Sequence, residues 1–192
     1  YYFETAWYDK IKFWLKPPYH SLEQGTPIHL SDEQKRHINP TPRNHQRLRG
    51  VAGSGKSLVI AQRAANLAAQ GKKVLVVSYN ITLWHYLRDM ISRVRVGFDW
   101  SQIEFTHFHI FCKDFLNEND IPWPDHKFSE NDWLDQIPQM VMAVKNNGKN
   151  YKGRQYDAIL IDEGQDYHKC WYDTLRMFLS NNDEILFVID EK

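Results

Sequence analysis

A complete phosphate-binding pattern, G-x-x-x-x-G-K-[ST], occupies residues 50–57, which read Gly50, Val51, Ala52, Gly53, Ser54, Gly55, Lys56 and Ser57. Its glycines permit backbone angles that turn successive N–H groups inward as an anion nest, and a following helix would point its positive end at the same anion. Lys56 adds a full charge aimed at the β- and γ-phosphates, and the Ser57 hydroxyl can ligate Mg²⁺. The pattern therefore predicts a site for a nucleoside triphosphate and Mg²⁺.

The segments around this loop favour a nucleotide site over a flexible Gly-Ser turn. Residues 57–70 are rich in alanine and aliphatic side chains and predict a helix of about four turns, which Gly71 would end. Residues 74–77 predict a buried parallel strand. The segment before the loop, residues 46–49, is short and polar, so we expect that strand to be partly exposed.

A second chemical signal follows the apolar segment 158–161, which would deliver Asp162 and Glu163 to the end of a strand. Ligands bind at the carboxyl ends of strands in open α/β sheets. We expect Asp162 to hold Mg²⁺ through its waters beside Ser57, and Glu163 to orient and deprotonate an attacking water. A solvated acidic turn is the alternative, but the phosphate loop in the same chain favours catalysis.

Strands and helices alternate from residue 46 onward. The predicted strands lie near 47–51, 74–78, 103–106, 157–161 and 184–189, and the predicted helices near 56–69, 81–92, 107–118, 130–146 and 169–180. This alternation predicts an α/β fold, with a mostly parallel sheet and helices on both faces. We expect residues 31–112 and 156–192 to form its core and residues 113–155 a small inserted subdomain.

Three further features are expected: an N-terminal extension, a short helix before the sheet, and a capped start for the helix near 130–146. Residues 1–30 form an aromatic and proline-rich extension, in which residues 7–15 have the spacing of a short docking helix. Residues 31–39 begin with a serine and predict a capped helix. Ser129 and Asp132 resemble the capping box of the helix near 130–146.

Composition and charge restrict the class of protein. The chain has 192 residues, 42% hydrophobic and 25% charged, as globular domains do, and its apolar segments are too short to span a bilayer, so we expect no membrane partner. Cys112 and Cys170 predict reduced thiols in a cytoplasmic protein rather than a disulfide framework or a zinc site. Since the chain starts without methionine and stops after an apolar strand, we expect a longer parent protein.

The zero net charge is unevenly distributed. Residues 1–112 hold 15 Lys and Arg against 8 Asp and Glu, whereas residues 113–192 hold 9 against 16. This asymmetry is compatible with a polyanion that meets the first part of the chain, and equally with solvated faces that average in this way.

Several segments together resemble the superfamily 1 helicases of the UvrD/Rep-like group. Residues 162–166, Asp-Glu-Gly-Gln-Asp, resemble the DExQD box of that family, and residues 51–57 match its first motif closely. Residues 30–34 look like its adenine-reading Gln motif, and residues 76–80 look like its strand-end loop that touches single strands. Residues 187–190 resemble the opening of its third motif.

A looser match lies at Phe108-His109, which resembles the Phe-His of the family's next motif. The family usually has Thr before the Phe, whereas this chain has His107 there and Thr106 one place earlier. The resemblance spans residues 30–190 and implies only the first RecA-like domain. A second RecA-like domain, with arginines that reach the γ-phosphate, would lie in the missing part of the parent chain.

The resemblance also implies roles for individual residues. Gln34 would recognise the adenine base of ATP, and Gln165 would couple the γ-phosphate to nucleic acid. Single-stranded nucleic acid, DNA ahead of RNA, would be contacted by Tyr79, Asn80, Thr106, Phe108 and His109. A buried core position is the alternative for Phe108.

The leading interpretation is the N-terminal ATPase domain of a helicase or translocase that hydrolyses MgATP to move on single strands. One alternative is another P-loop NTPase, such as a nucleotide kinase or transporter ATPase, but a kinase would not need Glu163 and Gln165. The other is a nucleotide-gated nucleic-acid sensor that binds ATP without unwinding.

Overall fold

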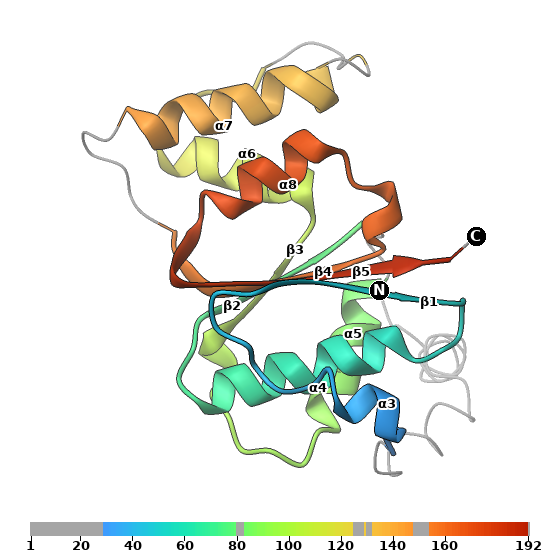
Figure 1. Ribbon diagram of the computed structural model, residues 1–192. Coiled ribbons are helices and arrows are strands. Elements are labelled where there is room, and N and C mark those ends of the chain that lie inside the picture. Colours follow the sequence, from blue (N-terminus) through green and yellow to red (C-terminus); the bar gives the residue numbers. More distant parts are fainter. Residues whose placement is uncertain (1–28, 80–82, 125–128, 130–131, 148–153, 192) are drawn as a thin grey trace, which may run out of the picture.

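The protein is described here from a computed structural model, which covers residues 29–79, 83–124, 129, 132–147 and 154–191 (Figure 1). The docking helix expected within residues 1–30 therefore lies outside the described residues, as does Asn80.

One sheet of five strands forms the centre of the fold: β1 (His45–Gly50), β2 (Val74–Ser78), β3 (Ile103–Thr106), β4 (Tyr156–Asp162) and β5 (Leu179–Asp190). Their order is β1-β5-β4-β2-β3, and every pairing is parallel. The predicted parallel sheet is confirmed. Because β1, β5 and β4 are adjacent and run parallel, their carboxyl ends lie at the same end of the sheet, which we call its carboxyl edge.

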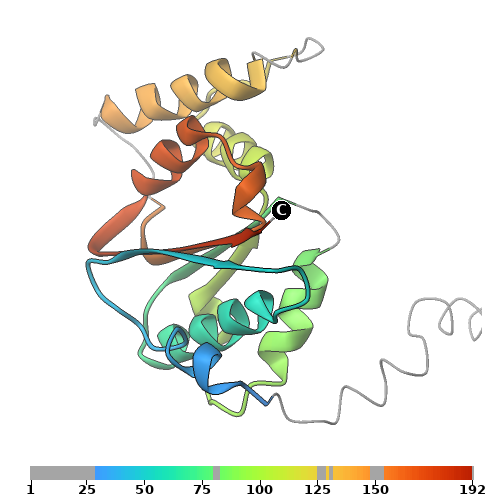
Figure 2. The ribbon, with the colours of Figure 1, turned by 45° about the vertical axis from the view of Figure 1, so that its right-hand side comes forward.

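Helices cover both faces of the sheet, as predicted (Figure 1). One layer contains α3 (Asp32–Lys35), α4 (Lys56–Ala69) and α5 (Leu83–Ser92), and the other contains α6 (Phe108–Glu118), α7 (Ile137–Asn146) and α8 (Lys169–Arg176). Figure 2 shows the same two layers after a 45° turn. Shorter elements are the 3₁₀ turns η1 (Trp100–Gln102) and η3 (Gly164–Asp166) and the π-helical turn η2 (Asp132–Gln136).

Alternating side chains of the strands build two apolar clusters, one on each face. Along β2, Val74 and Val76 pack against α4 and α5, while Leu75 and Val77 pack against α6 and α8. All five β2 residues are buried, as expected for a strand covered on both faces. In contrast, β1 alternates between exposed and half-buried residues at the sheet edge, which confirms the expectation from its polar sequence.

Some predicted boundaries are wrong. Helix α8 ends at Arg176 rather than 180, and β5 begins at Leu179 rather than 184, because the Tyr156–Leu179 pairing extends the sheet past a bulge at the start of β4. Helix α3 is shorter than the predicted 31–39. Its capping box is nevertheless complete, since Ser31 Oγ accepts from the Gln34 N–H and Gln34 Oε1 accepts from the Ser31 N–H.

The predicted insertion begins inside a helix, since α6 continues past residue 112 to Glu118. The predicted capping pair precedes α7: Ser129 N and Oγ donate to the Asp132 carboxylate at 2.6 and 2.8 Å, and η2 follows. Helix α7 buries Ile137 and Val141 in the same cluster as the sheet. The division of the chain into core and insertion stays a prediction.

Candidate functional site

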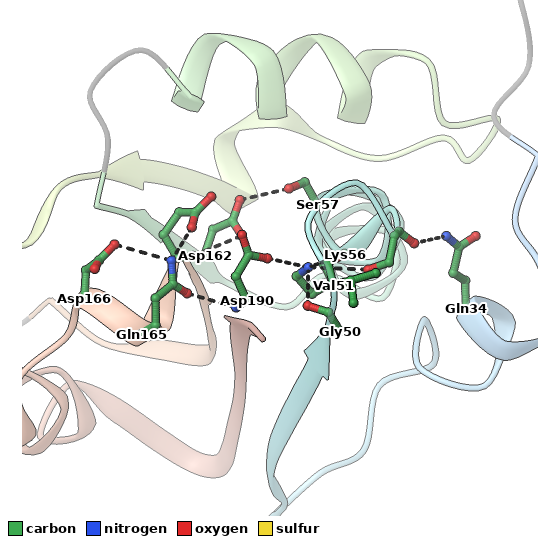
Figure 3. A network of polar contacts seen from close by, with 11 residues as sticks. Gln34, Gly50, Val51, Lys56, Ser57, Asp162, Gln165, Asp166 and Asp190 are labelled. Atoms are coloured by element: carbon green, nitrogen blue, oxygen red, sulfur yellow. Dashed lines mark hydrogen bonds and ion pairs between the residues drawn. The ribbon is translucent and has the colours of Figure 1, made fainter. Parts of the chain in front are cut away.

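The phosphate loop connects the edge strand β1 to helix α4 (Figure 3). Gly53 and Gly55 both have a φ of 80°, in the left-handed region that favours glycine. A Cβ on Gly55 would also overlap the side-chain amide of Gln34. The loop therefore needs glycine at residue 55 both for its backbone angle and for the approach of Gln34, and it directs the first turn of α4 at the carboxyl edge of the sheet.

The Lys56 ammonium is held at the mouth of this loop. Nζ donates to the carbonyl oxygens of Gly50 at 2.9 Å and Val51 at 2.7 Å, and forms an ion pair with Asp190 at the end of β5. A weaker contact joins it to Ser54 Oγ at 3.4 Å. The side chain is 10% exposed. Strand pairing explains the ion pair, since Gly50 and Asp190 are register partners across β1 and β5.

The two predicted metal ligands lie together although 105 positions separate them in the chain. Ser57 Oγ in the first turn of α4 donates to Asp162 Oδ2 at the end of β4, at 3.1 Å. Both face a cavity of about 320 Å³ that is lined by the phosphate loop, α5 and the ends of β4 and β5: Gly53, Gly55, Lys56, Ser57, Leu58, Tyr86, Met90, Asp162, Glu163, Val188 and Asp190. A hydroxyl and a carboxylate are the oxygen donors that Mg²⁺ accepts beside substrate phosphates.

Burial is the main cause that raises the pKa of Asp162, to about 6. The carboxylates of Glu163 and Asp190 raise it further, while the hydrogen bonds from Ser57 and the Glu163 N–H act in the opposite direction. Concentrated negative charge around a 3% exposed carboxylate disfavours ionisation, and a cation in the cavity would relieve it.

Glu163 and Gln165 form a polar bridge beside this cavity. Glu163 has a φ of 54°, unusual for a residue other than glycine, and caps η3. Gln165 Nε2 donates to a Glu163 carboxylate oxygen, and Gln165 Oε1 accepts from the Asp190 N–H at 3.0 Å. Gly164 permits this arrangement, because a Cβ there would lie 2.8 Å from Val188 O and still closer to the Phe187 ring. The catalytic candidate and the end of β5 are therefore joined through one side-chain amide.

Gln34 lies on the other side of the phosphate loop (Figure 3). Its Nε2 donates to Ser54 O at 2.9 Å, and its Oε1 accepts from Ser31 N at 2.8 Å. A cavity of about 340 Å³ borders the side chain and is lined by Ser31, Glu33, Gln34, His37, Leu48, Arg49, Gly50, Val51, Ser54, Lys56, Val59 and Glu191.

Side chains of α4 hold the segment that follows Gln34 through hydrogen bonds to its backbone. Arg63 is fully buried, pairs with the buried Glu184 of β5 at 2.7 Å and donates to His37 O at 2.8 Å. Asn66 donates to Ile38 O at 3.0 Å. These contacts fix the chain just after α3 and so fix the distance of Gln34 from the phosphate loop.

Three of the predicted nucleic-acid residues, Tyr79, Phe108 and His109, line a separate cavity of about 220 Å³, together with Ser78, His107, Tyr167 and Trp171. Tyr79 is 51% exposed and lies nearly parallel to Trp171, with ring centroids 6.4 Å apart. Phe108 is only 2% exposed and stacks on Trp171 at 4.8 Å, which matches the core alternative weighed for it. Thr106 is also buried, at the end of β3.

His109 contributes no positive charge to this cavity at neutral pH. Burial, and to a smaller extent His107, lowers its pKa to about 4. An anionic backbone near the cavity would therefore have to be attracted by other groups. The sequence did not point to Trp171 and Tyr167, which complete the cavity, nor to Tyr86 at the phosphate site, and it indicated Asp190 only through the resemblance of residues 187–190 to the third motif. Only the aromatic content of residues 167–172 hinted at the first two.

A parallel sheet with helices on both faces, a phosphate loop after one strand and an acidic pair at the end of another define a P-loop NTPase domain of the RecA-like class. The chain belongs to the UvrD/REP helicase N-terminal domain family, whose model matches residues 30–152. The matched range contains the phosphate loop, Tyr79 and Phe108, while Asp162 and Glu163 lie beyond it. The family is one of helicase-type ATPases, so the resemblance seen in the motifs is confirmed.

A search of curated proteins finds no match to this chain. Within the described ranges, no helix combines the length and the apolar character needed to cross a bilayer.

Proposed function

We propose that this chain is the N-terminal ATPase domain of a helicase or translocase that hydrolyses MgATP to move on single-stranded nucleic acid, DNA ahead of RNA. One observation carries the proposal. Ser57 and Asp162 meet at 3.1 Å, beside Lys56 and Glu163, around one cavity at the carboxyl edge of the sheet. These are the four groups that bind and hydrolyse a triphosphate in P-loop enzymes.

Each group has a distinct part in the proposed reaction. The loop N–H groups and Lys56 bind the β- and γ-phosphates, and Ser57 and Asp162 hold Mg²⁺. Mg²⁺ held by these two residues would supply positive charge against the charge that develops on the phosphates. Glu163 accepts the proton of the attacking water, and the bridge from Gln165 keeps the Glu163 carboxylate oriented.

Base recognition is proposed for Gln34, because its side-chain amide makes only half of the hydrogen bonds that it can form. An amide has two N–H donors and two acceptor lone pairs, and Gln34 spends one of each within the loop and its own cap. One donor and one acceptor remain at the 340 Å³ cavity. That pair complements adenine, which presents an acceptor ring nitrogen next to its amino donor.

For nucleic acid, we propose a path over Tyr79 at the mouth of the aromatic cavity. Its ring is exposed and backed by Trp171, so a base can stack on it without reorganising the protein. Asn80, Thr106, Phe108 and His109 stay predictions; burial of Phe108 makes it a support for Trp171 in this proposal. The partner domain would be a second RecA-like domain that supplies arginines to the γ-phosphate. The free thiols of Cys112 and Cys170 favour a cytoplasmic location.

Titration of MgATP into wild type and Lys56→Ala tests the nucleotide site. The variant should lose about 1.5–3 kcal/mol of binding free energy, the contribution of a charge-assisted hydrogen bond. Lys169→Ala is the matched control, since Lys169 is highly exposed on α8 and pairs only with Asp173 among the contacts described. Equal affinity of folded wild type and Lys56→Ala would contradict the assignment.

A further inference from the structure

Asp190 brings a third carboxylate to the phosphate cavity, beside Asp162 and Glu163. It is the last residue of β5 and lines the same cavity as Lys56 and Ser57. Its carboxylate forms the ion pair with Lys56 (Figure 3). The Asp190 side chain is 33% exposed. The pair lies where the phosphates of a bound nucleotide would meet Lys56.

The Lys56 ammonium has no spare hydrogen for an incoming phosphate. An ammonium carries three donors and no acceptor. Gly50 O, Val51 O and the Asp190 carboxylate take these donors, with Ser54 Oγ further away at 3.4 Å. A phosphate oxygen can bind Lys56 only if one of the three partners leaves.

Electrostatics selects which partner must leave. The two carbonyl oxygens are dipoles within the loop itself, whereas Asp190 carries a full negative charge that repels a triphosphate as well as occupying its counter-ion. The backbone of Asp190 is pinned, because its N–H donates to Gln165 Oε1 and the next N–H, of Glu191, donates to Gly50 O at 3.0 Å. Release therefore requires only a rotation of the Asp190 side chain.

We propose that Asp190 is a positioning residue that competes with nucleotide phosphates for Lys56. In the free protein it neutralises Lys56 and keeps the ammonium at the loop mouth. In the bound protein the phosphates replace it, and its carboxylate turns away. The affinity for phosphate then depends on the difference in free energy between the Lys56–phosphate pair and the Lys56–Asp190 pair. Asp190 therefore lowers this affinity. This inference rests on the proposed nucleotide site.

Asp190→Asn tests the competition, because it keeps the shape of the side chain and removes its charge. We expect it to bind Mg-tripolyphosphate and MgATP about tenfold more tightly than wild type, a change of about 1.4 kcal/mol. Asp190→Glu, which restores the carboxylate, should bring the affinity back toward the wild-type value. A merely structural role would weaken binding instead.

Glu191→Gln is the matched control for tripolyphosphate binding only, since it removes the same charge one residue further along while Glu191 makes no contact with Lys56 among the described interactions. Tripolyphosphate removes any contribution from the base cavity that Glu191 lines. Equal or weaker binding by Asp190→Asn, or equal tightening by Glu191→Gln, would overturn the role of Asp190. If none of the four proteins, wild type included, bound either ligand, the proposed nucleotide site itself would fail.

Discussion

The phosphate cavity and the aromatic cavity lie at the same carboxyl edge of one sheet but are built in opposite ways. The first contains charged groups that have polar partners, since Lys56 forms an ion pair with Asp190 and the Asp162 carboxylate accepts a hydrogen bond from Ser57. The second is walled by rings and by a histidine whose pKa burial lowers to about 4. The proposed function assigns a multiply charged ligand to the first cavity and a flat, stacking ligand to the second.

The turn η3 lies in the chain between a residue of each cavity, since Glu163 before it lines the phosphate cavity and Tyr167 after it lines the aromatic cavity. Gln165 holds Glu163 and the end of β5 on the phosphate side, and Tyr167, immediately after the turn, lines the aromatic side. Tyr167 contacts both Tyr79 and Trp171 edge-on, with ring centroids 6.4 and 5.6 Å apart. Gln165 is only two residues from Tyr167 in the chain. We therefore expect a change in the hydrogen-bond partners of Gln165 to shift Tyr167 at the aromatic cavity.

The largest effect is expected at the phosphate cavity. In a protein that carries the proposed second RecA-like domain, Glu163→Gln should lower ATP turnover by about 10²–10⁴-fold, because it removes the proposed general base while it keeps the side-chain shape. MgATP binding should persist, which serves as the internal control. Steady-state hydrolysis with and without single strands measures the loss, and undiminished turnover would clear Glu163 of this role.

An intermediate effect should separate the two cavities by ligand. Tyr79→Ala should weaken single-strand binding by about 1–3 kcal/mol, the contribution of one base stacked on an aromatic side chain. Tyr86→Ala is the matched change, because Tyr86 is similarly exposed but lines the phosphate cavity. We expect it to alter MgATP binding and to leave single-strand binding unchanged.

Fluorescence anisotropy with a labelled oligonucleotide across a salt series measures this difference. The affinity of the wild type should fall with added salt through counterion release. Equal single-strand affinities for wild type and Tyr79→Ala would place the nucleic-acid path elsewhere on the molecule.

The smallest effect concerns the neutral histidine of the aromatic cavity. A pKa lowered to about 4 means that between pH 6.5 and 4 the unfolded chain protonates His109 and the folded chain does not. The free energy of unfolding should therefore fall as pH falls through this window, by about 1 kcal/mol after discounting for partial exposure. His109→Gln should lack this contribution.

Urea unfolding at several pH values between 6.5 and 4 checks the effect as a difference between wild type and His109→Gln. The difference matters because the raised pKa of Asp162 acts in the opposite direction in both proteins and cancels. His29→Gln, at an exposed residue, is the control. Parallel curves for wild type and His109→Gln would show that His109 is not held neutral by burial.

Sequence reasoning reached the phosphate cavity more completely than the aromatic one. Lys56 and Ser57 belong to one contiguous motif. Asp162 follows a strand that its apolar residues predict, so both parts of the site can be recognised from short stretches of sequence. Trp171 belongs to no comparable motif, because its place beside Tyr79 depends on the packing of α8 against Phe108 of α6. Asp190 was visible as a motif residue, but its pairing with Lys56 depends on the adjacency of β1 and β5.

Boundaries failed where tertiary pairing overrides local preference. Residues 177–183 have no strand pattern of their own, yet β5 starts at Leu179 because it pairs with Tyr156 past a bulge. The burial of Phe108 was equally out of reach, since an aromatic residue after a strand is compatible with either a stacking surface or a core. Regular periodicity predicted the layers, while the contacts between distant segments decided the details.

The position of β1 has a consequence for how the protein is made. Among the described strands, β1 pairs with β5 alone, and their register joins residues 45–50 to residues 185–190. A ribosome releases the phosphate loop long before it releases the strand that holds the loop in place. A nucleotide at the proposed site could therefore assist folding of the nascent chain only after β5 has emerged, and closing the long loop between β1 and β5 is entropically costly and slow. Until then the backbone groups of β4 that pair with β5 are unpaired. Such a strand edge is prone to aggregation, so we expect a chaperone to bind the nascent chain at this stage.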